Sequence, residues 1–301
     1  MPDILVRAID AQAGLRIIAA MTTELCREGA RRHGALGLAA CALGRGLTSG
    51  LLLATLTKGN ERVTLQLQGD GPLGGLTIDA TLDPNASGQV RGYLYHPKEA
   101  AAPCIGRGRV VEVLGRDGVV NVTRDIGLKE RYQGQVAILT GEIDEDVERY
   151  LRESEQVPSA LGCDALLLDG SSIDAAAGVL VQAIPGAGSH EAWEAQHAMR
   201  AGAVYEYLQK GGRDARELAQ TVYGKPLAFL GEQPLAFQCR CSAERVRDML
   251  KLLGVIEIDE ILADRGAAEV TCNYCNSLFV IERPDLEVIR AELAGGPRIN
   301  N

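Results

Sequence analysis

Aromatic residues are scarce in this sequence. Phenylalanine, tyrosine and tryptophan together make up 4 % of the 301 residues, whereas hydrophobic residues of all kinds make up 46 %. Aromatic rings, which often supply much of the buried area of a core, can therefore contribute little here. We expect aliphatic side chains and alanine to build the core, and the charged fraction of 24 % is that of a soluble globular protein.

Positive charge is also in short supply. The chain has 31 lysine and arginine residues against 40 aspartate and glutamate residues, which gives a formal net charge of −9. Broad, sequence-independent binding to nucleic acid needs clustered lysine and arginine. The charge balance therefore argues against nucleic acid as a partner.

The chain also has little that resembles a membrane span. The most apolar early stretch, residues 35–56, is interrupted by Arg45 and flanked by glycine, serine and threonine, so we expect a buried helix there. The opening residues carry acids early and lack the basic and then apolar order of a secretory signal. We therefore expect a cytoplasmic protein with no membrane partner. Its eight cysteines should bind metal or react more often than they form structural disulfides.

The first part of the chain, residues 1–185, predicts an α+β domain. A short strand is expected at residues 4–8, and residues 10–58, rich in Ala, Leu and Gly, are expected to be helical. From residue 62 to about 184 most segments alternate in character between turns of Gly, Asp and Asn, which is typical of strands. The expected strands are RVTLQLQ, GLTIDATL, GQVRGYLY, GRVVEVL, GVVNVTRD, GQVAILT and GVLVQAI, and an acidic helix is expected at residues 143–155.

A helical linker is predicted at residues 186–233. Residues 190–230 are helical in pattern and strongly polar, with a break at Gly211 and Gly212. Only a partial apolar stripe runs along them: Trp193, Met199, Val204, Tyr205 and Leu208. Helices of this kind are marginal alone and depend on a neighbouring surface.

The last part of the chain, residues 234–301, predicts a small domain stapled by metal. Ser242 should cap a helix over residues 243–253, and a second short helix should follow at 257–265. Two strands should then flank the sequence CNYC, before a final helix that follows Pro284. Few apolar residues are available here for a core, and a structural metal is the usual support for so small a module.

Two close pairs of cysteines supply the candidate metal ligands. Cys239 and Cys241 are one residue apart, and Cys272 and Cys275 follow about thirty residues later with two residues between them. A disulfide between cysteines at i and i+2 closes a tiny ring, so it would be strained and easily reduced. Four cysteines in two such pairs fit tetrahedral zinc with four sulfur ligands, and all four histidines of the chain lie elsewhere.

Local charge should favour the thiolate form of these cysteines. Cys241 precedes the N-terminal end of a predicted helix, where partial positive charge accumulates. Three arginines are close to it in sequence: Arg240, Arg245 and Arg247. Both features lower the pKa of a thiol.

The other cysteines receive no role. They are Cys26, Cys41, Cys104 and Cys163, and we expect them to pack as small hydrophobic residues. Cys104, which follows Pro103 in a predicted loop, is the one that we expect to be exposed.

One glycine-rich segment matches the sequence pattern of a dinucleotide-binding site. GDGPLG, residues 69–74, matches G-x-G-x-x-G, but it leads from one predicted strand to another. No helix N-terminus is present to receive a pyrophosphate, so we expect a turn. The sequence also shows no GxSxG, HExxH or P-loop, and we assign no enzyme activity or catalytic residue.

Longer segments carry a family resemblance. The C-x-C and C-x-x-C pairs with their separation stand beside AAGVLVQAIPG, RYQGQVAIL, GDGPLGGLTIDA, GQVRGYL, TRDIGLKERYQGQV, TGEI and SEQVPSA. Together they resemble the redox-regulated bacterial chaperone family named heat shock protein thirty-three, over essentially the whole chain. The departures are an Ala- and Gly-rich linker and a tail that continues past Leu293.

The resemblance implies a holdase that binds unfolding client proteins. In such a protein the reduced, zinc-bound form is inactive, and the family's four cysteines correspond to Cys239, Cys241, Cys272 and Cys275. Oxidation forms disulfides, ejects zinc, unfolds the C-terminal part and opens a surface for clients. We expect the pairings Cys239–Cys241 and Cys272–Cys275, because the nearest nucleophile of each thiolate is its sequence neighbour, and a homodimer in the oxidised, active form.

Two other function classes remain open from the residues alone. A zinc ribbon without a redox role would dock nucleic acid or a protein partner, but Tyr274 is the single aromatic residue in the CNYC segment, the expected knuckle, that supports it. An oxidoreductase with an active Cys-x-x-Cys would need a thioredoxin-like βαβ context around Cys272, where the sequence predicts a knuckle.

Overall fold

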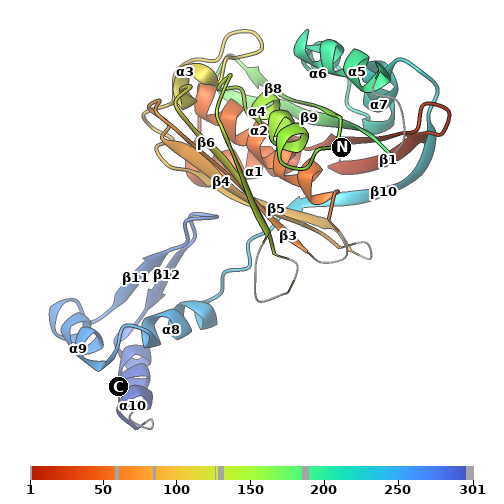
Figure 1. Cartoon of the computed structure of the whole chain (residues 1–301). Helices are drawn as coiled ribbons and strands as arrows, with labels where there is room; N and C mark the ends of the chain where they lie inside the picture. Colours follow the sequence, from red (N-terminus) through yellow and green to blue (C-terminus); the bar gives the residue numbers. More distant parts are fainter. Residues whose placement is uncertain are drawn as a thin grey trace. The chain divides into compact units, whose positions relative to one another are not determined.

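The protein consists of two compact units. The computed structural model describes residues 2–57, 61–83, 86–125, 127, 132–184 and 190–295, and the chain divides at residues 238 and 239 into Met1–Gln238 and Cys239–Asn301 (Figure 1). The first unit mixes helices with a large sheet, which confirms the α+β class. The expected boundary at residues 185 and 186 lies outside the described residues.

The first unit is built on one ten-stranded sheet. Its spatial order is β7-β6-β3-β4-β5-β10-β1-β2-β9-β8, and neighbouring strands are antiparallel except for the parallel pair β5 and β10. The strands are β1 (Ile4–Asp10), β2 (Leu15–Met21), β3 (Arg62–Gly69), β4 (Gly75–Leu82), β5 (Gly88–Leu94), β6 (Gly118–Asp125), β7 (Tyr132–Ala137), β8 (Ser159–Leu168), β9 (Ser172–Ala183) and β10 (Ala228–Phe237).

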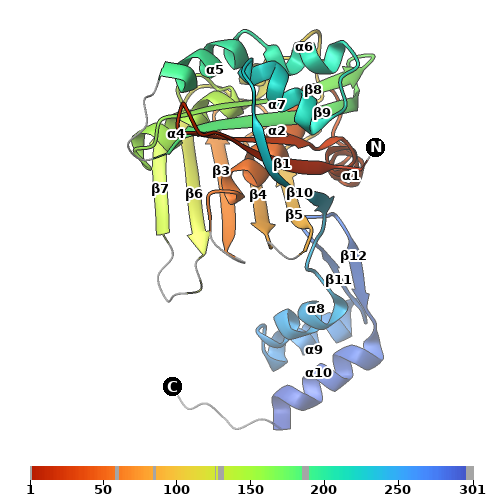
Figure 2. The same cartoon turned by 90° about the vertical axis from the view of Figure 1, so that its right-hand side faces the viewer.

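Helices cover both faces of this sheet. They are α1 (Thr23–His33), α2 (Gly37–Ala54), α3 (Val111–Leu114), α4 (Ile143–Glu153), α5 (His190–Arg200), α6 (Ala203–Gln209) and α7 (Ala215–Tyr223). Figure 2 shows α5, α6 and α7 on one face of β1, β8 and β9, with α2 on the opposite face. The part of the sheet formed by β1, β8 and β9 therefore lies between two helical layers.

Helix α2 forms the centre of the larger core. All of its residues are buried, and it packs against β3, β4, β5, β8 and β9. It is long and apolar enough to cross a membrane by length and composition, but it lies wholly inside the structure. The expectation of a buried helix around residues 35–56 is therefore confirmed.

The prediction that residues 10–58 are helical throughout is wrong for β2. This strand, LRIIAAM, pairs with β1 on one side and β9 on the other. Ile18 and Ala20 enter the core around α2, while Ile17 and Ala19 face α5–α7. Because both faces of the strand are covered, its sequence is apolar throughout residues 17–21 and lacks the alternation that marks a half-buried strand.

Two further segments differ from their predictions. GRVVEVL ends in the short helix α3 and not in a strand. The carboxylate of Glu142 accepts hydrogen bonds from the backbone amides of Val110 (3.3 Å) and Val111 (3.4 Å), which satisfies donors at the start of that turn. Strand β10 follows α7, and no strand was predicted there.

Of the segment predicted as a helical linker, residues 190–223 carry α5, α6 and α7, which pack within the first unit, whereas residues 228–233 belong to the strand β10. Met199, Val204 and Leu208 of the predicted stripe are buried, and Tyr205 is half-buried. Trp193 is 54 % exposed, so its place in the stripe is wrong. The helices of α5–α7 share one hydrophobic cluster with β1, β2 and β9.

The second unit has a small core of its own. It contains α8 (Ala243–Lys251), α9 (Val255–Asp264), the antiparallel hairpin β11 (Ala268–Thr271) and β12 (Leu278–Ile281), and α10 (Arg283–Gly295). These elements agree with the predicted two helices, hairpin and final helix. The buried apolar residues are Val246, Leu250, Ile258, Leu262, Ala268, Ile281, Leu286 and Ile289.

Candidate metal centre

Short local structures position the two cysteine pairs. Cys241 directly precedes Ser242, whose hydroxyl accepts a hydrogen bond from the amide of Arg245 (3.2 Å) and caps α8 as predicted. Cys272 and Cys275 lie in the tight connection between β11 and β12. In this connection the amide of Cys272 donates to the carbonyl of Ser277 over 2.9 Å.

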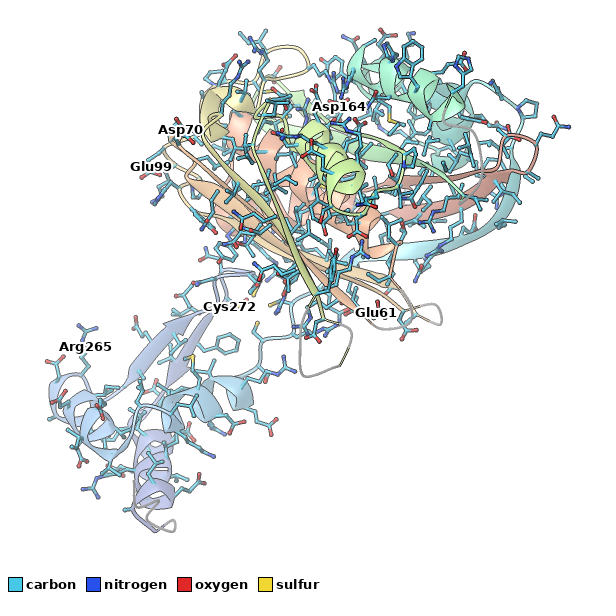
Figure 3. All side chains as sticks on the ribbon, in the orientation of Figure 1. Glu61, Asp70, Glu99, Asp164, Arg265 and Cys272 are labelled. Atoms are coloured by element: carbon cyan, nitrogen blue, oxygen red, sulfur yellow. The ribbon has the colours of Figure 1, made fainter. Side chains whose placement is uncertain are left out.

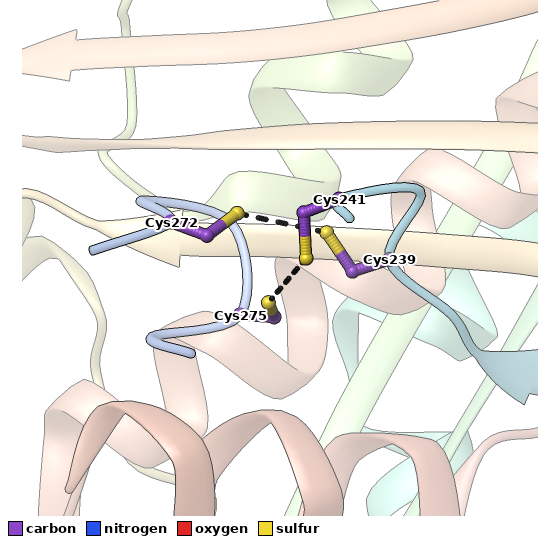
Figure 4. A group of neighbouring side chains, drawn as sticks. All are labelled: Cys239, Cys241, Cys272 and Cys275. Atoms are coloured by element: carbon purple, nitrogen blue, oxygen red, sulfur yellow. Dashed lines mark hydrogen bonds between the residues drawn. The ribbon is translucent and has the colours of Figure 1, made fainter. Parts of the chain in front are cut away.

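The four sulfur atoms converge on one point. All of them lie within 4.8 Å of one another. The Sγ atoms of Cys239 and Cys272 are 3.7 Å apart, and those of Cys241 and Cys275 are 3.4 Å apart (Figure 4). Four sulfurs placed about 2.3 Å from a central zinc ion would be about 3.8 Å apart, so this geometry fits tetrahedral zinc.

Burial and composition agree with a four-sulfur site. Cys275 is 2 % exposed, and the other three cysteines are partly buried. The four histidines of the sequence all precede Cys239, so the second unit has none to compete as a ligand. The structure therefore brings together the four predicted residues into a cluster that could hold one metal ion.

The pKa values of these thiols are set by burial and by their neighbours in the cluster. Burial raises the pKa of Cys241, and the neighbouring thiols of Cys275 and Cys239 raise it further. Burial likewise raises the pKa of Cys272. Burial also acts to raise the pKa of Cys275, but hydrogen bonds with Ser277 and the cluster thiols outweigh it and bring this pKa to about 6.

The pKa of Cys241 is therefore raised when no cation is bound, and the expectation that its surroundings favour the thiolate form is wrong for that state. Two of the three neighbouring arginines are engaged elsewhere: the guanidinium of Arg245 donates to the carbonyl of Arg240 (2.5 Å), and that of Arg247 pairs with Asp285 (2.7 Å). Negative charge on several adjacent sulfurs is mutually unfavourable unless a cation sits between them. The cluster therefore favours deprotonation of all four thiols when a metal ion binds.

The remaining cysteines all lie in the first unit. Cys26, Cys41 and Cys163 are fully buried, as expected for small hydrophobic residues. Cys104 is 5 % exposed, so the expectation that it is exposed is wrong. Its loop is held against the first turn of α2, where the amide of Leu38 donates to the carbonyl of Ala102 (2.8 Å).

The GDGPLG segment is a turn between β3 and β4, as predicted. The side chain of Asp70 accepts hydrogen bonds from the amides of Arg116 (3.0 Å) and Asp117 (3.1 Å). The segment is therefore occupied in joining two loops of the sheet, and it leads to a strand rather than to a helix.

Sequence reasoning missed a buried charge cluster. Arg45, noted only as an interruption of an apolar stretch, is 1 % exposed and pairs with Asp164 (2.7 Å) and Glu142 (2.5 Å). Asp164, labelled in Figure 3, also accepts from the guanidinium of Arg107 over 2.9 Å. The signal in the sequence was an arginine within an otherwise apolar helix, which must find acidic partners if it is buried.

Comparison with known proteins agrees with the fold. The family model described as Hsp33 protein matches residues 3–282. The 33 kDa chaperonin of Citrifermentans bemidjiense is 37 % identical over 295 residues, which cover 98 % of this chain and 99 % of that protein. The 33 kDa chaperonin of Bacillus subtilis is 34 % identical over 289 residues, which cover 96 % and 98 %.

A solved structure gives the same result in three dimensions. The crystal structure of the 33 kDa chaperonin, a heat shock protein 33 homologue, from Thermotoga maritima matches with a TM-score of 0.86 and 26 % identity. The match covers 98 % of this chain and 99 % of that chain. With the family match over residues 3–282, the chain belongs to the Hsp33 family of chaperones.

Proposed function

We propose that this chaperone is a holdase controlled by the oxidation state of Cys239, Cys241, Cys272 and Cys275. The observation that carries the proposal is the approach of their four sulfurs to within 4.8 Å of one another in a member of the Hsp33 family. In the reduced protein the four thiolates hold one zinc ion, and the chaperone is inactive. Oxidation converts the ligands to disulfides, releases zinc and activates binding of unfolding proteins under oxidative and heat stress.

Zinc is the metal that we propose, because the ligand set is four thiolates in a tetrahedral arrangement. Soft sulfur ligands in this geometry are typical of zinc or iron–sulfur sites, and structural zinc sites are closed by four protein ligands. The small core of the second unit makes its folding depend on the metal. Loss of the ion is then a signal that unfolds the unit.

We propose three functional parts for the chain. Residues 1–185 form the chaperone core, residues 186–233 act as the responsive segment, and residues 234–301 form the redox-switch domain. Support for the second part comes from α5–α7, whose apolar side chains cover β1, β2 and β9. Release of these helices would expose apolar surface on both partners, and large apolar patches of that kind bind other proteins.

We propose that the active protein is a cytoplasmic homodimer that binds unfolded clients. It binds neither nucleic acid nor membranes. The net charge of −9 supports the exclusion of nucleic acid. The burial of α2 supports the exclusion of a membrane span. No catalytic residue is assigned, and the proposed activity is binding without turnover.

One set of samples tests this function. The full chain is purified reduced, its zinc content is measured, and it is then treated with hydrogen peroxide at moderately raised temperature. We expect about one zinc per chain before oxidation and its loss afterwards, because oxidised sulfur no longer binds the ion. Suppression of aggregation of a thermally unfolded client should appear with zinc loss, and sedimentation should show a dimer.

The alternatives give different results in the same samples. A zinc ribbon without a redox role would bind clients equally well, or not at all, in the reduced and the oxidised protein. A dithiol oxidoreductase would turn over a disulfide substrate without suppressing aggregation. A folded reduced protein that contains no zinc would reject the metal assignment.

Disulfide pairing gives a second prediction. In the folded cluster, sulfurs of different pairs are close to each other: Cys239 lies 3.7 Å from Cys272, and Cys241 lies 3.4 Å from Cys275. We nevertheless expect Cys239–Cys241 and Cys272–Cys275. Once zinc has left and the unit has unfolded, closing a short loop costs less entropy than closing one of about thirty residues.

Peptide mass mapping of the oxidised protein measures this pairing. The two local bridges should dominate, and a dithiol reductant should reverse both, because strained or exposed disulfides are easily reduced. Bridges mainly between the distant pairs would mean that oxidation precedes unfolding and follows the folded geometry.

A further inference from the structure

Two cysteines of the first unit also lie together, far along the chain from the metal cluster. Cys41 is on α2, and Cys104 is in the loop between β5 and α3. Each thiol perturbs the pKa of the other, which is raised at Cys41 and lowered at Cys104. Both sulfurs flank Gly108: a Cβ atom at this glycine would lie 2.4 Å from the Sγ of Cys104 and 3.4 Å from the Sγ of Cys41.

Backbone contacts fix this arrangement. The amide of Leu38 donates to the carbonyl of Ala102 (2.8 Å), and the amide of Ala39 donates to the carbonyl of Ala100 (3.1 Å). The amide of Cys104 itself donates to the carbonyl of Gly170 over 3.0 Å. The loop is therefore bound to the first turn of α2, one turn before Cys41.

We propose that Cys41 and Cys104 form a second redox site, which closes a disulfide in the first unit without using the metal cluster. Both sulfurs flank Gly108, so movement of the loop and of the two side chains toward each other would bring them to bonding distance.

The two cysteines have different roles in the oxidation. Cys104 is 5 % exposed and is next to Ile105, which is 89 % exposed, so an oxidant reaches it first, whereas Cys41 is 0 % exposed. The neighbouring Cys41 thiol lowers the pKa of Cys104 although burial opposes this, and the positive charge of Arg45 acts in the same direction as Cys41. Cys104 is therefore the reactive thiolate, and Cys41 is the resolving thiol.

With hydrogen peroxide as the oxidant, the chemistry balances in two steps. The Cys104 thiolate attacks one peroxide oxygen, the O–O bond breaks, and hydroxide leaves, so that Cys104 becomes a sulfenic acid. The Cys41 sulfur then attacks the Cys104 sulfur, the S–O bond breaks, and the oxygen leaves as water. The two thiols lose two electrons in total, and peroxide is reduced to two water molecules.

The same loop contacts the helices proposed to respond to oxidation. The guanidinium of Arg107 donates to the carbonyl of Arg200, at the end of α5, over 2.9 Å. A Cβ atom on Gly202 would lie 3.7 Å from the Cδ of Arg107. A bond between Cys41 and Cys104 would tighten the loop beneath this contact, so the redox state of the pair should affect the end of α5.

Mass mapping of the full chain tests the site. After oxidation by peroxide, remaining thiols are alkylated and the protein is digested. We expect a peptide pair joined through Cys41 and Cys104, and complete loss of this pair in Cys104→Ser, in which Cys41 becomes available to the alkylating agent. The matched control Cys163→Ser removes another buried thiol of the same unit and should keep the bond.

Two results would overturn the proposal. One is that Cys41 and Cys104 are both still free thiols, and are therefore alkylated, after the four cluster cysteines have been oxidised. The other is that Cys104 is joined mainly to a cluster cysteine. Amide exchange of residues 196–202 provides a second readout. It should differ between the oxidised wild type and oxidised Cys104→Ser, and equal exchange would reject the link to α5.

Discussion

Replacing Cys272 with serine is expected to release the metal and to unfold the second unit. Removing one thiolate breaks the four-sulfur site, and zinc binding contributes about 10–16 kcal/mol of apparent free energy in small zinc-dependent peptides. The apolar core of this unit is small and cannot replace that contribution. Metal analysis should show loss of zinc, and amide exchange should become fast across residues 239–295.

The same variant should bind clients without an oxidant. The chain connects α7 to Cys239 through β10, which pairs with β1 and with β5. Unfolding that starts at the cysteines therefore reaches the end of β10 first, and it should raise amide exchange in residues 190–230. The released surface should suppress client aggregation by the reduced protein.

Two controls define this result. Cys26→Ala removes a buried cysteine of the first unit and should leave zinc and exchange in the second unit unchanged. Tyr205→Glu, on α6, should loosen the helices while zinc stays bound. A Cys272→Ser protein with a protected 190–230 segment and full client holding would contradict the proposed coupling, and the client site would then lie elsewhere.

Replacing Arg45 with methionine is expected to destabilise the first unit by about 3–5 kcal/mol, the usual cost of breaking a buried ion pair. Arg45 is 1 % exposed, and its removal leaves Asp164 and Glu142 without their shared cation. The buried carboxylate of Asp164 and the partly buried one of Glu142 would then lie in a low-dielectric environment beside the partly exposed Arg107.

Denaturant unfolding followed by Trp193 fluorescence measures this loss. Trp193 is the one tryptophan of the sequence and lies on α5, where its ring contacts that of His197 at 3.9 Å between centroids. Arg31→Met is the matched control, because Arg31 pairs with Glu28 at the surface and should hardly change the midpoint. An unchanged midpoint in Arg45→Met would mean that the cluster contributes nothing to stability.

The destabilisation should depend on pH. Burial raises the pKa of Asp164 in spite of the nearby Arg45 and Arg107, and removal of Arg45 would raise it further. A carboxyl whose pKa is higher in the folded state than in the unfolded state makes the folded protein bind more protons, so stability falls as the pH rises through that range. Arg45→Met should therefore lose more stability at pH 8 than at pH 5.

The sequence alone determined the chemistry of the candidate metal site. The four ligand candidates could be selected because they form two close pairs and because no histidine accompanies them; they are Cys239, Cys241, Cys272 and Cys275. The elements around them were also predictable, since Ser242 is a strong cap and glycine ends its helix region. Local rules of this kind do not depend on the rest of the fold.

The tertiary structure decided what long-range packing controls. The strand β2 looked helical because α2 on one face and α5–α7 on the other make both of its faces apolar. The strand β10 could not be predicted because it is held by pairing with β1 and β5, distant in sequence. Strand pairing of that range leaves little local pattern.

The side-chain neighbours in the core were also decided by packing. Arg45 is compatible with a buried helix only because Glu142 and Asp164, about one hundred residues away, meet it there. Cys104 appeared to lie in an exposed loop, but backbone hydrogen bonds to α2 bury it beside Cys41. Residue type and local spacing therefore identified the ligands of the second unit, whereas contacts between distant segments decided which groups of the first unit are buried and paired.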